Sequence, residues 1–92
     1  MDELKNEMVE SLEEVDFTHM QVPMAVIYDS PKDFPGVYVC RIWEAVGCKA
    51  TDIVMLNNTL EEMREDIREA GFVYCFERTE SDDPVIVETW IR

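Results

Sequence analysis

Glycine and histidine are scarce in this chain, which has three glycines and one histidine among 92 residues. A loop that cradles phosphate groups needs several glycines at short spacing, and here a turn or a helix end accounts for each of Gly36, Gly47 and Gly71. The single histidine, His19, has no cysteine or histidine at the spacing of a zinc site. The sequence therefore predicts no nucleotide-binding loop, no metal centre and no cofactor.

Cysteines are few and unpaired: Cys40, Cys48 and Cys75 do not have the number or spacing of a disulfide framework. No apolar run approaches the ~20 residues that cross a bilayer, and the acidic start of the chain lacks the apolar segment of a signal peptide. We therefore expect a cytoplasmic protein with reduced thiols and no membrane partner.

No group of residues has the pattern of a catalytic site. Nothing in the sequence positions a cysteine next to His19 for nucleophilic catalysis. Adjacent acids on a helix, such as Glu61 and Glu62, point in different directions, which favours a solvated surface over acid–base chemistry. We expect no catalytic residues and no enzymatic activity.

Basic residues are also few, because eight Lys and Arg stand against 21 Asp and Glu, for a net charge of −13. Nucleic acid and anionic membranes carry the same sign and are therefore disfavoured as direct ligands. Partners with basic surfaces are favoured, and nucleic-acid-binding proteins are the commonest of these. The alternative is that the acidity only keeps a small protein in solution.

An apolar fraction of 47% predicts one folded domain over residues 1–92, in spite of the charge. Its first part, residues 1–16, is expected to be an amphipathic acidic helix, because apolar residues recur there at helical spacing. Those residues are Leu4, Met8, Leu12 and Val15. This stripe has to be buried, either on the protein's own sheet or in a homodimer.

The remainder, residues 24–91, is expected to form a β-β-β-α-β-β core. Strands are predicted at 24–28, 37–44, 52–56, 72–78 and 85–91. Thr59 and Glu62 have the spacing of a capping box, and the helix that they begin ends at Gly71. The connections between the first three strands are too short for crossover helices. The predicted fold is α+β, an antiparallel sheet of about five strands with two helices, in the order α-β-β-β-α-β-β.

Acidic residues gather on the two expected helices, whereas acids and bases balance in residues 21–50. This separation predicts a one-sided acidic surface that binds the partner. Its candidate residues are Glu62, Glu65, Asp66 and Glu69 on the second helix and Glu10, Glu13 and Glu14 on the first. Trp43 and Trp90 are further candidates, because an exposed tryptophan is a common anchor of interfaces, although in a small domain such residues are more often core.

Residues 24–70 resemble the HicB-type antitoxins. The matching residues are Gly36-Val37-Tyr38-Val39, the Gly47-Cys48 loop and Thr59-Leu60-Glu61-Glu62. The resemblance implies a partial RNase H-like fold without the nuclease carboxylates, and a role in covering a small basic ribonuclease toxin. The longer stretch between Gly47 and Thr59, the N-terminal helix and the lack of a C-terminal DNA-binding segment depart from the pattern, so autoregulation of an operon is not implied.

We therefore expect a small, acidic, non-enzymatic protein that binds and inhibits a basic, nucleic-acid-handling protein such as a nuclease. It would act as an antitoxin-like neutraliser or as a phage or mobile-element inhibitor that mimics nucleic-acid charge. The alternative is a structural or interaction module whose acidity serves only solubility.

Overall fold

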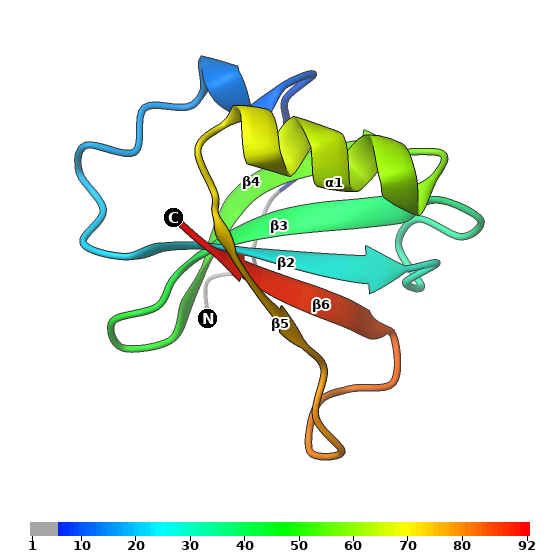
Figure 1. Cartoon of the computed structure of the whole chain (residues 1–92). Helices are drawn as coiled ribbons and strands as arrows, with labels where there is room; N and C mark the ends of the chain where they lie inside the picture. The colour runs from blue at the N-terminus through cyan, green and yellow to red at the C-terminus, as the bar shows by residue number, and fades with distance from the viewer. Residues whose placement is uncertain (1–5) are drawn as a thin grey trace.

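The computed structural model describes residues 6–92, which form six strands, one α-helix and one 3-10 turn (Figure 1). In chain order the elements are β1 (Glu7–Met8), the turn η1 (Leu12–Glu14), β2 (Pro23–Asp29), β3 (Tyr38–Glu44), β4 (Lys49–Asn57), α1 (Leu60–Glu69), β5 (Tyr74–Glu77) and β6 (Ile86–Ile91). The predicted α+β class is confirmed.

All six strands belong to one mixed sheet, in the order β1-β4-β3-β2-β6-β5. Every neighbouring pair is antiparallel except β1 and β4, which are parallel. The five expected strands are thus present and antiparallel to one another in the sheet, and the short β1, parallel to β4, adds a sixth. Since β4 and β5 run in the same direction, their connection has to cross the sheet, and α1 provides that crossover.

The predicted N-terminal helix is wrong for residues 6–16, while its residues 2–5 lie outside the described part of the chain. Ser11 is extended, its side chain accepts from the backbone N–H of Glu13, and the Glu14 side chain accepts from the backbone N–H of Ser11. A Ser-x-x-Glu capping box marks the start of a helical turn, so in the middle of the expected helix it interrupts the pattern. Of the predicted stripe, Met8 is 50% exposed and Leu12 is fully buried.

The second predicted helix is confirmed as α1. The Thr59 hydroxyl accepts from the backbone N–H of Glu62 at 3.1 Å and caps the first turn. Met63 and Ile67 are fully buried on the apolar stripe of α1. The helix is followed by Gly71 at a φ of +94°, a conformation that side chains with a Cβ rarely adopt.

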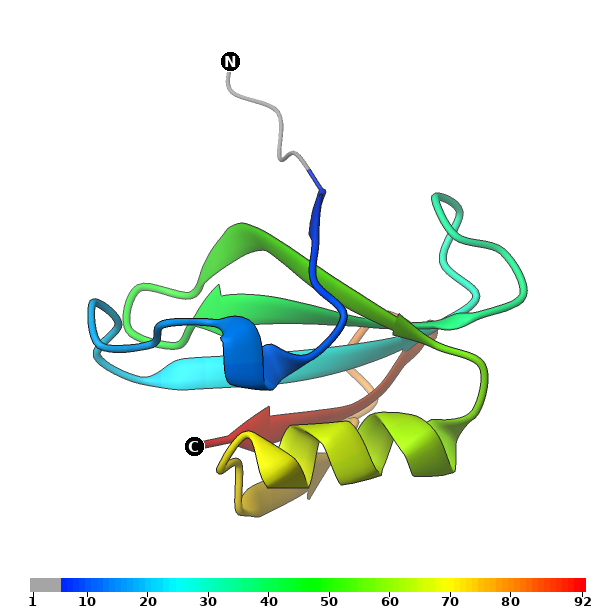
Figure 2. The same ribbon diagram turned by 90° about the horizontal axis from the view of Figure 1, so that it is seen from above.

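Figure 2 shows from above that α1 lies along one face of the sheet. The hydrophobic core lies between α1 and this face. Strand residues Ala25, Ile27 and Ile42 point into it, and Leu12 of η1 closes one side. No described helix covers the opposite face of the sheet, which we call the open face.

The docking of η1 gives a first prediction. Replacing Leu12 by Ala should lower the free energy of unfolding by about 3 kcal/mol, because a fully buried leucine leaves a cavity when truncated. Urea denaturation followed by circular dichroism measures this. Glu13→Ala is the control, as an exposed neighbour in the same turn, and should change stability by less than about 0.5 kcal/mol. Equal effects of the two variants would mean that η1 is not part of the core.

Candidate protein-binding surface

The acidic candidates of α1 lie together on one flank of the helix. At about 100° per residue, they occupy a sector about 100° wide, beside the buried stripe and away from the basic residues of the helix. These acids are Glu62, Glu65, Asp66 and Glu69. The acids that the sequence places on one side of the predicted helix therefore lie on one side of α1 in the structure.

The structure brings the acids of η1 to the same side of the molecule. Leu12 packs in the core that α1 covers, and Glu13 lines the same shallow hollow as Glu69, together with the base Arg92. We call the combined surface the acidic flank; it consists of Glu62, Glu65, Asp66 and Glu69 with Glu10, Glu13 and Glu14. Although the N-terminal helix is absent from residues 6–16, its predicted acid Glu13 lies beside Glu69 of α1, and Glu10 and Glu14 belong to the same turn as Glu13.

Both bases of α1 face the other way, toward β6. Arg64 donates from Nε and Nη2 to the two carboxylate oxygens of Glu88, at 3.0 and 2.7 Å. The Arg68 guanidinium lies 5.5 Å from the centroid of the Trp90 ring, within the range of a cation–π contact. Because these contacts hold the bases on the opposite flank, they do not neutralise the acidic flank directly.

Glu88 is a buried charge, with 5% of its surface exposed. Its Oε2 also accepts from the Trp90 indole N–H at 2.8 Å. Burial by itself raises the pKa of this carboxyl, but the bonds from Arg64 and Trp90 outweigh it, so that the pKa lies below its usual value. Glu88 is therefore ionised at neutral pH and joins β6 to α1.

Two members of the acidic flank also have structural roles. Asp66 accepts from the side-chain amide of Asn57 at 3.0 Å, which ties α1 to the end of β4. Glu14 accepts from the backbone N–H groups of Glu10 and Ser11. The other five acids, which are Glu62, Glu65, Glu69, Glu10 and Glu13, are exposed to solvent.

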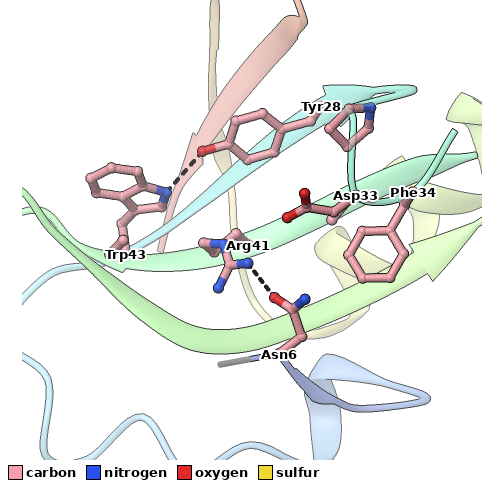
Figure 3. A pocket seen from close by; sticks show the side chains of 9 residues that line it. Asn6, Tyr28, Asp33, Phe34, Arg41 and Trp43 are labelled. Atoms are coloured by element: carbon pink, nitrogen blue, oxygen red, sulfur yellow. Dashed lines mark hydrogen bonds between the residues drawn. The ribbon is translucent and has the colours of Figure 1, made fainter. Parts of the chain in front are cut away.

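The two candidate tryptophans lie in different places. Trp90 is in the core, 5% exposed, and so does not present its ring at the surface. Trp43 is half-buried on the open face, where its indole N–H donates to the Tyr28 hydroxyl at 3.1 Å (Figure 3). Neither tryptophan belongs to the acidic flank.

Trp43 borders a hollow of about 330 Å³ that the sequence did not reveal (Figure 3). Asp33 and Phe34, in the loop between β2 and β3, form one wall of it. Arg41 lies beside Trp43 and donates to the backbone oxygen of Thr51 and to the side chain of Asn6. The alternation of side chains along β3 places Arg41 and Trp43 on one face, but the loop wall depends on tertiary structure.

The cysteines do not gather in a site. Cys40 is buried, and burial raises the pKa of its thiol to about 12, while Cys48 and Cys75 are exposed. Cys75 lies in the strand predicted at 72–78, and it is exposed because β5 is an edge strand. Within residues 6–92, no three His, Cys, Asp or Glu side chains are grouped so that they could hold a metal ion.

In residues 6–92 there is no helix with the length and apolarity that a membrane span requires.

Comparisons with known proteins give no further information on the fold or on the site. The chain matches no protein-family model, no curated protein and no solved structure. The resemblance of residues 24–70 to HicB-type antitoxins therefore stays a prediction.

Removal of the buried charge gives a second prediction. Glu88→Gln should lower the free energy of unfolding at pH 7 by about 2 kcal/mol, less than for a fully buried pair because water can reach Arg64. The folded-state pKa of Glu88 is lowered, so the carboxylate stabilises the fold above its usual pKa of 4.5, and this contribution is lost as the pH falls through the folded-state value. Urea titrations at pH 7 and pH 3 should show the difference between wild type and variant shrinking.

The control for this prediction is Glu77→Gln, an exposed carboxylate paired with Glu88 across β5 and β6. It should have little effect at either pH. A loss of stability in Glu88→Gln that is the same at pH 7 and pH 3 would contradict the role of the charge.

Proposed function

We propose that the acidic flank binds a basic, nucleic-acid-handling protein and inhibits it by occupying its positively charged site. The observation that supports this proposal is the separation of charge across α1. Its acids face outward with those of η1, whereas Arg64 and Arg68 are held against β6. Acidity that served only solubility would not require this separation.

The spacing of the exposed acids suits a site built for phosphates. Along α1, Glu62, Glu65 and Glu69 follow one another at about 4.5 and 6 Å, from the 1.5 Å rise per residue. A nucleic-acid strand has one phosphate per ~3.4 Å along its axis, which is a similar density of charge. A basic cleft would therefore meet a row of negative charges on a rigid helix, and long-range attraction would speed the encounter.

Two versions of this function use the same surface. An antitoxin-like neutraliser would cover a small basic toxin, as the resemblance of residues 24–70 implies. A phage or mobile-element inhibitor would instead imitate the charge of nucleic acid toward a host protein. In both versions the chain has no catalytic role, and its partner is recognised by basic charge. The competing interpretation is an interaction module whose acidity serves only solubility.

The third prediction is that reversing three exposed acids of α1 abolishes partner capture. Glu62→Lys, Glu65→Lys and Glu69→Lys are combined, while Asp66 is kept because it holds Asn57. Basic nucleic-acid-handling proteins should be captured from lysate by the wild type and lost with this variant. With the captured partner purified, the association rate should fall at least about tenfold, toward the ~10⁵–10⁶ M⁻¹s⁻¹ of neutral pairs, and its salt dependence should flatten.

The matched control reverses three acids outside the acidic flank, by Glu7→Lys, Glu77→Lys and Glu80→Lys. These residues are also exposed, and the change in net charge is the same. The control should keep the partner and most of the association rate, with circular dichroism showing that both variants are folded. Equal loss in both variants would mean that only net charge matters. Equal retention would leave the acids with no role in binding.

A further inference from the structure

The hollow on the open face is lined by two charged side chains of opposite sign. Arg41 belongs to β3, and Asp33 belongs to the loop between β2 and β3. Figure 3 shows the Asp33 carboxylate directed across the hollow toward Arg41, with no bond drawn between them. Within residues 6–92, Arg64 and Glu88 form the only ion pair, so Arg41 and Asp33 are not paired with each other. The hollow therefore offers one positive and one negative group to a ligand that lies between them.

Arg41 is half-buried, yet its hydrogen bonds within the described residues are to neutral groups. Its Nη1 donates to the backbone oxygen of Thr51 at 2.7 Å, and its Nη2 donates to the side-chain oxygen of Asn6. A guanidinium has five N–H donors, and the use of two leaves three for a ligand. Arginine binds a carboxylate through two parallel N–H bonds, as Arg64 does with Glu88. Arg41 therefore has the donors and the charge to hold the carboxylate of a ligand.

Asp33 supplies the opposite charge from a loop that its own bonds hold in place. In the described part of the chain, the Asp33 carboxylate accepts no hydrogen bond and forms no ion pair. The backbone N–H of Phe34 donates to the backbone oxygen of Pro31 at 2.9 Å, and that of Gly36 donates to the Ser30 hydroxyl at 3.2 Å. Because these bonds fix the loop, a ligand that donates to Asp33 would not have to order it first.

Three aromatic side chains line the hollow between the two charges. They are Phe34 from the loop, Tyr28 from β2 and Trp43 from β3. The bond from the Trp43 indole N–H to the Tyr28 hydroxyl holds two of these rings in place. Aromatic rings attract one another beyond the effect of burial alone. The volume of about 330 Å³ lies at the small end of the ~300–1,000 Å³ of ligand pockets, which favours a ligand with one ring system.

We propose that this hollow binds a free α-amino acid with an aromatic side chain. The carboxylate of the amino acid accepts from Arg41, its ammonium group donates to Asp33, and its ring packs against the aromatic side chains of the hollow. The charges favour this ligand over one of a single sign. Arg41 repels an ammonium group that has no carboxylate beside it, whereas Asp33 and the net charge of −13 repel an anion. A zwitterion has no net charge and meets each of the two groups with the opposite sign.

The fourth prediction concerns the two indole N–H signals in nitrogen–proton NMR spectra. Titration with L-phenylalanine should shift the signal of Trp43, which borders the hollow, and leave that of Trp90, which is in the core. The shift should saturate with a dissociation constant of about 1 mM or below. Phenylpropionate lacks the ammonium group, and phenylethylamine lacks the carboxylate. Each should bind at least about tenfold more weakly than L-phenylalanine, because each loses one charged hydrogen bond.

Variants of the two charged residues test the same contacts from the side of the protein. Asp33→Asn and Arg41→Gln should each raise the dissociation constant of L-phenylalanine at least about tenfold, with circular dichroism showing that both are folded. Lys32→Gln is the matched control, an exposed residue of the same loop that does not line the hollow, and it should leave the constant unchanged. A Trp43 signal that does not move at about 10 mM L-phenylalanine would overturn the proposal. Binding of either analogue as tightly as L-phenylalanine would also overturn it, because the hollow would then select a single charge.

Discussion

The salt bridge between Arg64 and the buried Glu88 is the interaction on which the arrangement of the molecule depends. It ties α1 to β6, and the bond from Asn57 to Asp66 ties the other flank of the helix to β4. These two attachments, together with the buried Met63 and Ile67, determine the rotation of α1 about its axis. Because its bases are held toward β6, its exposed acids face the side where η1 packs. The acidic flank is thus a consequence of how a buried carboxylate obtains its partner.

The same construction leaves the molecule with two surfaces of different character. In residues 6–92 the α-helix covers one face of a six-stranded sheet. The opposite face carries mostly apolar and aromatic side chains, and the loop between β2 and β3 walls a hollow on it with Asp33 and Phe34.

The sequence correctly predicted the elements that depend on interactions between residues close together along the chain. Thr59 caps α1 as predicted, and the strands were located to within a few residues, because capping and side-chain alternation depend on neighbours along the chain. The predicted N-terminal helix is absent from residues 6–16 because the Ser11–Glu14 capping box begins a separate turn inside the apolar stripe. The exposure of Cys75 could not be predicted, since it depends on β5 being at the edge of the sheet.

By itself the sequence determined the acidity of the chain, the α+β class and the separation of acidic segments from neutral ones, because these follow from composition and short-range periodicity. Only the tertiary structure decided which surfaces those segments form. The strand order, the direction in which α1 presents its acids and the open face depend on contacts between distant residues, such as Arg64 and Glu88, which are 24 positions apart. No local pattern specifies such a pair, because its energy depends on the burial that the whole fold provides.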